Sequence, residues 1–266
     1  MKAYVISLEG SERRAVARER AIECGLDLIF FDGINLVDKN PNDYLDLFDI
    51  DGFKLRHHRS PSSGDIGCTL SHYSLWKKLS NETKDKYHLI LEDDFISKVH
   101  AEEILEVVNS TDLNFDVLLL GYSKVTAKEE SIINIINPIK ELYSTEQHRI
   151  GFKFRESSCG AVAYIVSRNF ITKVSKLKQK PCHVPDDWPF FKQNGFNIFH
   201  VKPLCFYEDF LNMKSYIKES GRYIPMHDNP SLNKKNLLFR VLRWVYRYSY
   251  GRLLASLMYF GIRSSS

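Results

Sequence analysis

Short apolar runs alternate with charged or irregular stretches along most of the chain. The runs predict β-strands, because they are rich in β-branched and aromatic residues and are bounded by polar or turn-forming ones. They comprise Ala3 to Leu8, Leu28 to Phe31, Tyr87 to Leu91, Asp116 to Leu120, Ala161 to Val166 and Phe196 to Val201. Strands separated by helical segments predict an α/β fold with a largely parallel central sheet.

Helical periodicity marks three of the intervening segments. Arg13 to Cys24 is a charged stretch that suits a helix, and Gly67 to Leu79 places its apolar residues at helical spacing. Arg168 to Lys178 predicts a further, amphipathic helix. By contrast, Asp32 to Ser63 is rich in Asp, Asn, Pro and Ser, so it predicts a long irregular excursion. The cluster Pro61 to Gly64 suits a hinge or lid base at its end.

The composition excludes several classes of protein. With 266 residues, of which 44% are hydrophobic, the chain can bury a large core and is neither disordered nor a disulfide-stapled miniprotein. The five cysteines are scattered and form no CxxC pair, which argues against a zinc ribbon and favours a reducing compartment. The first apolar run is too short for a signal peptide, and no run approaches the ~18 residues of a membrane span. We therefore expect a cytoplasmic protein.

Charge is distributed unevenly along the chain. The formal net charge is +4, yet Lys234 to Arg263 holds seven basic residues and no acidic one. The remaining 30 basic and 33 acidic residues make the rest mildly acidic. We therefore expect a catalytic domain over residues 1–230 and a basic, aromatic tail over residues 231–266.

The tail predicts an amphipathic helix with separate apolar and basic sides. The apolar side holds Leu237, Leu238, Val241, Leu242 and Val245, and the basic side holds Arg240, Arg243 and Arg247. Such a helix suits an anionic surface, so we expect peripheral binding to the cytoplasmic face of the inner membrane. The alternative is that its apolar side packs on the catalytic domain or on a partner subunit. Because the body is acidic and no nucleic-acid-binding motif is present, we expect no nucleic acid partner.

The sharpest chemical feature is an apolar strand that ends in Glu92, Asp93 and Asp94. Strand alternation puts Glu92 and Asp94 on one side and Asp93 on the other. In open α/β sheets, ligands bind beyond the carboxyl ends of strands. Paired carboxylates there suit Mg²⁺ or Mn²⁺ that also contacts substrate phosphates. The alternative is a solvated acidic loop or a helix N-terminus.

Two further segments carry candidate donor-binding residues. The segment Gly64 to His72 contains two glycines at the start of a predicted helix, so the backbone amides of this segment are suited to binding a phosphate. His72 falls on the predicted buried face of that helix, where a structural, hydrogen-bonded histidine is an equal alternative. Arg13 and Arg14 follow the first strand and are suited to clamping a diphosphate, with a solvated helix face as the alternative.

A carboxylate pair close to an aromatic ring supplies a candidate general base. Asp186 and Asp187 precede Trp188, a combination that suits holding and deprotonating a sugar hydroxyl. A Pro-Asp turn ahead of a helix explains the same residues without catalysis. His183, His200 and His227 are candidate third metal ligands, although a lone histidine is more often structural.

These motifs together resemble glycosyltransferase family 25. They are Tyr4 to Leu8 with Arg13 and Arg14, Phe31 to Ile34, Gly64 to His72, Leu89 to Asp94, and Gly160 to Ser167. The resemblance runs from residue 1 to about 210. It implies a GT-A-type nucleotide-sugar-binding fold, a UDP-sugar donor and inversion at the anomeric carbon. It also implies a DxD-like metal motif, which here reads Glu92, Asp93 and Asp94, with Glu in place of the first Asp.

The family includes bacterial lipooligosaccharide galactosyltransferases. The resemblance therefore implies transfer of a hexose onto a lipooligosaccharide or lipopolysaccharide acceptor. The expected donor is UDP-galactose, and UDP-glucose is the alternative. We expect Mn²⁺ or Mg²⁺ at Glu92 and Asp94, and Asp187 as the base with Asp186 as its nearest rival. The residues expected to bind the donor are Arg13, Arg14, Ser71, His72 and Asp93.

Two other functions explain the same motifs. A metal-dependent phosphohydrolase would use the acidic strand end to activate water against a nucleotide diphosphate. A non-catalytic nucleotide-sugar-binding protein would attach to membranes through its tail. UDP release that depends on an acceptor distinguishes a transferase from both.

Overall fold

A computed structural model describes residues 1–36, 39–109, 114–153, 156–177 and 179–213, together with Ser249 and Leu253. The predicted amphipathic helix of the tail, with the boundary at residue 231, falls outside these described residues. Within the described part, no helix has both the length and the apolar character needed to cross a bilayer.

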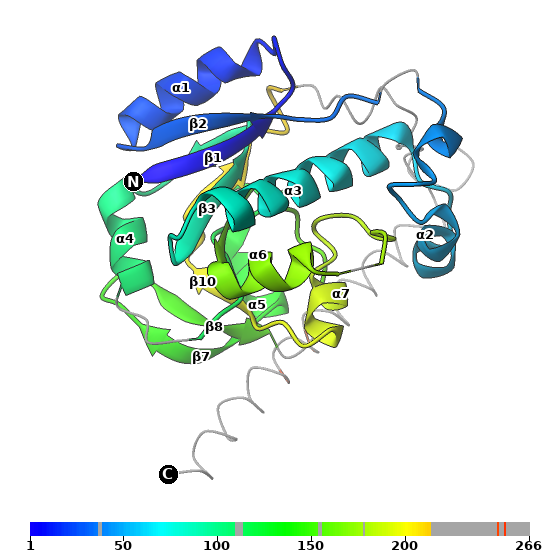
Figure 1. Cartoon of the computed structure of the whole chain (residues 1–266). Coiled ribbons are helices and arrows are strands. Elements are labelled where there is room, and N and C mark those ends of the chain that lie inside the picture. Colours follow the sequence, from blue (N-terminus) through cyan, green and yellow to red (C-terminus); the bar gives the residue numbers. More distant parts are fainter. Residues whose placement is uncertain are drawn as a thin grey trace, which may run out of the picture.

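An eight-stranded sheet forms the centre of the molecule, in the order β2-β1-β3-β9-β5-β10-β8-β7 (Figure 1). Its strands are β1 (Lys2–Ser7), β2 (Asp27–Asp32), β3 (Tyr87–Glu92), β5 (Val117–Leu119), β7 (Ile139–Ser144), β8 (Arg149–Lys153), β9 (Ala163–Ser167) and β10 (Ile198–Lys202). Only β8 and β9 run against the direction shared by the others. The predicted α/β fold with a largely parallel central sheet is confirmed, since every predicted strand is present and each of its ends lies within two residues of the expected position.

Helices cover both faces of this sheet (Figure 1). Side chains of α1 (Arg13–Glu23) and α4 (Ala101–Asn109) pack on one face. Side chains of α3 (Ser63–Glu82), α6 (Arg168–Ser175) and α7 (Trp188–Gln193) pack on the other. The sheet is therefore buried between two helical layers, which explains why its central strands read as continuous apolar runs.

The three predicted helices are confirmed as α1, α3 and α6. Helix α3 begins earlier than predicted, because Ser62 and Asp65 form a reciprocal capping box at its N-terminus. Ser63 and Gly64 are thus the first residues of this helix and do not form the irregular segment that the predicted hinge at 61–64 implied.

The predicted irregular excursion between β2 and α3 is also wrong in part. It contains a short 3₁₀ helix, η1 (Pro41–Tyr44), and α2 (Ile50–His57), which Asp49 caps by accepting a hydrogen bond from the Gly52 amide. Phe48 and Phe53 are buried in a small core of their own with Ile66 of α3. The excursion is therefore packed against α3 rather than loose.

A three-stranded sheet lies beside the main one, in the order β4-β11-β6. Its strands β4 (Phe95–Ser97), β6 (Gly121–Tyr122) and β11 (Phe206–Glu208) continue the chain beyond β3, β5 and β10. The small sheet therefore stands at the carboxyl ends of these parallel strands and brings Glu208 to that edge. The remaining helix, α5 (Glu130–Ile136), follows β6.

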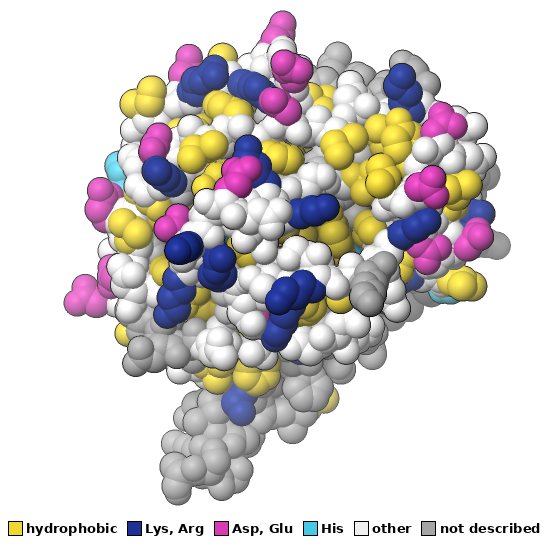
Figure 2. Space-filling model, in the orientation of Figure 1, with side chains coloured by type: hydrophobic (Ala, Val, Ile, Leu, Met, Phe, Trp, Pro, Cys, Tyr) yellow, Lys and Arg dark blue, Asp and Glu magenta, His cyan; other side chains and the backbone are white. Residues whose placement is uncertain are grey.

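The outer surface carries charges of both signs. On the face seen in Figure 2, Lys and Arg side chains are interspersed with Asp and Glu and with smaller apolar areas.

Candidate active site

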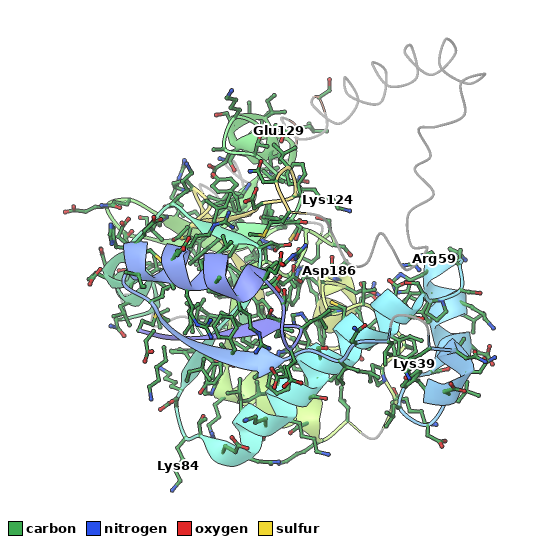
Figure 3. The ribbon with its side chains drawn as sticks, turned by 90° about the horizontal axis from the view of Figure 1, so that it is seen from above. Lys39, Arg59, Lys84, Lys124, Glu129 and Asp186 are labelled. Carbon is green, nitrogen blue, oxygen red and sulfur yellow. The ribbon has the colours of Figure 1, made fainter. Side chains whose placement is uncertain are left out.

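A cavity of about 780 Å³ opens at the carboxyl ends of β1 and β3. Its polar lining comes from segments far apart in the sequence. The charged, thiol or hydroxyl lining residues are Ser7, Arg13, Arg59, Ser63, Cys68, Ser71, His72, Glu92, Asp93, Asp94, Ser123, Lys124, Ser158, Cys159, Asp186 and Glu208. In Figure 3, Lys124 and Asp186 are labelled near the middle of the view, and Arg59 lies beside α2, the light-blue helix.

The register of β1 and β3 builds the first part of the site. Ile6 pairs with Glu92, so the next residues, Ser7 and Asp93, lie side by side at the carboxyl ends of the two strands. Ser7 Oγ donates to Asp93 Oδ2 at 2.6 Å, and Arg13 Nη1 donates to Asp93 Oδ1 at 2.9 Å. Both oxygens of Asp93 are thus partnered, and this carboxylate ties β1, β3 and α1 together.

Arg13 also donates to Asp94 Oδ2 at 3.3 Å. One guanidinium therefore reaches both aspartates, because the chain turns at these two residues instead of continuing the strand. The predicted placement of Asp93 and Asp94 on opposite sides is consequently wrong. Glu92 follows Ile90 toward the α3 face and lies near His72.

Several carboxylates lie close together at this end of the cavity. Asp94 Oδ1 is buried and has no hydrogen-bond partner. Burial, and then the charges of Glu208 and Asp93, raise the pKa of Asp94 from its ordinary 3.8 to about 7, although Arg13 opposes this. Burial and the charge of Asp94 likewise raise the pKa of Glu92 well above its ordinary value.

Glu208 was not found from the sequence. It lies at the end of β11, lines the cavity and accepts a hydrogen bond from the Lys124 amide at 2.9 Å. The signal that could have found it is the run Leu204 to Tyr207, which ends in Glu208 and Asp209 as β3 ends in its acidic residues.

His72 is fully buried beneath the cavity floor. Its Nδ1 lies 2.6 Å from Tyr164 Oη, and Trp76 Nε1 donates to the same oxygen at 3.1 Å. Its Nε2 faces Glu92 Oε1 at 3.9 Å. Burial lowers the pKa of His72 to about 3, so the ring is neutral at neutral pH. The histidine is thus both hydrogen-bonded in the core and part of the cavity lining.

Ser71 joins the cavity wall to α3. Its Oγ donates to Gly67 O at 2.6 Å and accepts from the Ile34 amide at 2.8 Å. A Cβ at Gly67 would lie 2.6 Å from Ile34 O, so only glycine permits this close approach. Ser71 and Gly67 therefore position the 33–36 segment along the cavity.

Of the two arginines expected to bind the donor, one lines the cavity and the other does not. Arg13 lines the cavity, whereas Arg14 donates to the Ser7 carbonyl at 2.9 Å and pairs with Asp32. Arg14 is absent from the cavity lining, and its guanidinium lies over the Phe30 ring. It supports the β1–β2 pair, and the geometry does not bring it together with the acidic residues.

Of the two candidate general bases, likewise, only one lines the cavity. Asp187 is buried, pairs with Arg56 through both carboxylate oxygens and caps α7 by accepting from the Phe190 amide at 3.2 Å. Burial acts to raise the pKa of Asp187, but the hydrogen bonds and charge of Arg56 outweigh it and the pKa is lowered. Asp187 does not line the cavity, whereas Asp186 does and accepts from the Gly160 amide at 3.2 Å.

The expected histidine ligands lie elsewhere in the fold. His183 uses Nδ1 on the Val184 carbonyl and Nε2 on the Tyr73 hydroxyl, both at 2.8 Å. His200 uses Nδ1 on Tyr122 and Nε2 on Glu156. Neither lines the cavity, so their candidacy as third metal ligands is wrong, because hydrogen bonds already occupy both ring nitrogens. His227 is outside the described residues.

Comparison with known proteins gives a family match over most of the chain. The model of "Glycosyltransferase family 25 (LPS biosynthesis protein)" matches residues 1–188. A "Glycosyltransferase 25 family member" of Aedes aegypti is 38% identical over 96 residues, 34% of this chain and 16% of that protein. "Procollagen galactosyltransferase 1-B" of Xenopus laevis is 25% identical over 153 residues, 54% of this chain and 25% of that protein. "Procollagen galactosyltransferase 2" of Mus musculus is 28% identical over 92 residues, 32% of this chain and 15% of that protein.

The aligned segments thus span a quarter or less of these relatives. Among solved structures, an active-site mutant of LgtC shows 14% identity and a TM-score of 0.36, covering 75% of this chain and 72% of that one. A UTP-bound UGPase from Acinetobacter baumannii shows 11% identity and a TM-score of 0.38, covering 75% and 85%.

Proposed function

Since the chain belongs to glycosyltransferase family 25, we propose that it transfers a hexose from a nucleotide sugar to an acceptor hydroxyl in the cavity beyond β1 and β3. The proposed donor is UDP-galactose, with UDP-glucose as the alternative, because relatives matching this chain are named galactosyltransferases. The proposed acceptor is a sugar hydroxyl of a lipooligosaccharide or lipopolysaccharide, in keeping with the family's description.

The observation that carries the proposal is the convergence of Glu92, Asp94 and Glu208 on one end of the cavity. Like charges held together out of water repel, and the unpartnered Asp94 Oδ1 has no proton donor to offset this. Oxygen donors of this kind fit Mg²⁺ or Mn²⁺. We propose that Glu92, Asp94 and Glu208 hold such an ion, which when bound would neutralise the diphosphate of the donor.

Arg13 supplies the fixed positive charge of the site. Its guanidinium already contacts Asp93 and Asp94, so it stands where the negative charge of a departing diphosphate would develop. Asp93 and Ser7 hold Arg13 and the turn at residues 93–94 in place. In this proposal Asp93 positions the donor site rather than touching the donor.

Asp186 is the proposed general base. It faces the cavity, whereas Asp187 is committed to Arg56 and to the cap of α7. In a single in-line displacement, the acceptor oxygen bonds to the anomeric carbon as the bond to the diphosphate oxygen breaks. The electron pair leaves with the diphosphate, the acceptor proton passes to Asp186, and the anomeric configuration inverts.

The direct experiment incubates the full chain with UDP-galactose or UDP-glucose, with Mn²⁺, Mg²⁺ or EDTA, and with or without a lipooligosaccharide acceptor. UDP release that requires acceptor and metal supports the proposal. Equal release without acceptor selects a phosphohydrolase, and donor binding without release selects a non-catalytic binding protein. Either of the last two results contradicts the transferase.

The membrane location is a proposal that rests on the tail sequence. Seven basic residues and no acidic one within Lys234 to Arg263 suit anionic headgroups at the cytoplasmic face of the inner membrane. Flotation of the full chain with phosphatidylglycerol vesicles, but not with phosphatidylcholine vesicles, is the expected result. Equal flotation with both, or with neither, contradicts the electrostatic part of the proposal.

A further inference from the structure

A second group of ligand-bearing side chains lies on the α3 side of the cavity. Cys68 and His72 are one helical turn apart on α3, and Glu92 approaches them from the end of β3. Their sulfur, nitrogen and oxygen atoms all lie within 4.8 Å of one another. At this spacing the three side chains can share one metal ion.

The chemistry of these donors differs from that of the carboxylate cluster. Thiolate and imidazole together select a borderline-soft ion, and Zn²⁺ is the common one, whereas Mg²⁺ and Mn²⁺ prefer oxygen. Zinc bonds of about 2.0 to 2.3 Å place neighbouring ligands roughly 3.5 Å apart. The donor atoms, up to 4.8 Å apart, need to approach one another by at most about 1.3 Å, and the Glu92 side chain, 29% exposed, has room to move.

The surrounding residues hold His72 in the orientation that such a site requires. Nδ1 lies 2.6 Å from Tyr164 Oη, which leaves Nε2 directed toward Glu92. Trp76 fixes Tyr164 in turn through its own hydrogen bond at 3.1 Å. Ligating histidines are commonly oriented by such a partner on the second ring nitrogen.

We propose that Cys68, His72 and Glu92 bind Zn²⁺, with the fourth position of the ion open to the cavity. Binding releases the Cys68 thiol proton to solvent, so the affinity for Zn²⁺ rises with pH. Glu92 also belongs to the carboxylate cluster, so a zinc ion here withdraws one oxygen ligand from that cluster. Zn²⁺ therefore inhibits the reaction that Mn²⁺ or Mg²⁺ supports. This inhibition rests on the proposed function, whereas the binding of zinc does not.

Cobalt spectroscopy of the full chain tests the binding separately from any activity. Co²⁺ added to the protein is expected to give a thiolate-to-cobalt charge-transfer band that one equivalent of Zn²⁺ abolishes. Cys68→Ser is expected to lose this band, and Cys159→Ser is the matched control, because Cys159 also lines the cavity but lies outside the group. Asp94→Asn alters the carboxylate cluster alone and is expected to keep the band.

No band in the unaltered chain, or an unchanged band in Cys68→Ser, overturns the proposal. Should Cys68→Ser fail to fold, alkylation of the unaltered chain decides the matter. Zn²⁺ is expected to slow iodoacetamide modification of Cys68 at least tenfold relative to Cys159, as located by peptide mass spectrometry. Equal alkylation of Cys68 with and without Zn²⁺ refutes the site. Zinc binding with an inactive transferase leaves the site standing and refutes only the proposed function.

Discussion

Replacing Asp186 by Asn is expected to stop transfer without loosening the fold. An asparagine oxygen still accepts the hydrogen bond from the Gly160 amide, but the side chain can no longer take the acceptor proton. General-base catalysis contributes typically ~10²- to 10⁴-fold, so kcat should fall by that factor. The temperature of half-unfolding should change little, because asparagine keeps the size of the side chain and the hydrogen bond from the Gly160 amide.

Asp187→Asn is the matched variant, and we expect it to lower the stability of the fold while leaving most of the activity. The change removes the negative charge and one of the two oxygens that accept hydrogen bonds from Arg56, and a charge-assisted hydrogen bond is worth about 1.5 to 3 kcal/mol when fully buried. The Arg56 side chain is 26% exposed and can turn to water, so a loss of about 2 to 3 kcal/mol is expected. For a chain of this size, that lowers the half-unfolding temperature by roughly 5 to 10 °C.

Both variants are measured by differential scanning calorimetry and by acceptor-dependent UDP release at 20 °C, where both remain folded. Asp187→Asn should retain kcat within about tenfold, because its carboxylate lies outside the cavity. Transfer by Asp186→Asn at the unaltered rate refutes the assignment. If the Asp187→Asn variant is folded but its activity falls by a factor of a hundred or more, Asp187 is the general base instead of Asp186.

Three other outcomes are expected. The raised pKa of Asp94, about 7 when folded against 3.8 when unfolded, contributes stability that is present at pH 5 and is lost by pH 8, up to about 3 kcal/mol in the metal-free chain. The difference in free energy of unfolding between the unaltered chain and Asp94→Asn, measured by urea unfolding in EDTA, should therefore change in this direction from pH 5 to pH 8; a difference that does not depend on pH contradicts the raised pKa. Gly67→Ala should cost about 1 to 3 kcal/mol in the same assay, because its methyl group would meet Ile34 O, and an unchanged midpoint contradicts the close approach. Glu208→Gln should weaken Mn²⁺-dependent UDP binding roughly tenfold by calorimetry, and equal affinity removes Glu208 from the cluster.

Much of the fold follows from local pattern. Each strand and helix predicted within residues 1–213 appears in the structure, because runs such as Tyr87 to Leu91 are apolar on both faces, a pattern typical of central strands in α/β folds. The direction of β9 does not follow from the sequence, since all five of its residues are buried and its pattern is the same whichever way the strand runs. Helix α2 was missed because its eight residues bury only Ile50 and Phe53.

The sequence predicts the kind of site, but it does not identify all of the residues that form it. The acidic end of β3 shows in the sequence because it interrupts an apolar run, and the structure places all three of its residues in the cavity. The choice between Asp186 and Asp187 depends on Arg56, more than a hundred residues earlier in the chain. Glu208 depends on the pairing of β11 with β4 and β6, which is likewise long-range. Local pattern carries no information on such contacts.

The central claim is that a divalent cation at the carboxyl end of β3 anchors the diphosphate of a nucleotide sugar. Anomalous diffraction from a crystal of the full chain grown with UDP and Mn²⁺ tests it most directly. We expect a manganese peak within coordination distance of Asp94 and of a UDP phosphate oxygen. A peak and nucleotide bound elsewhere, with Glu92 and Asp94 contacting neither, would contradict it.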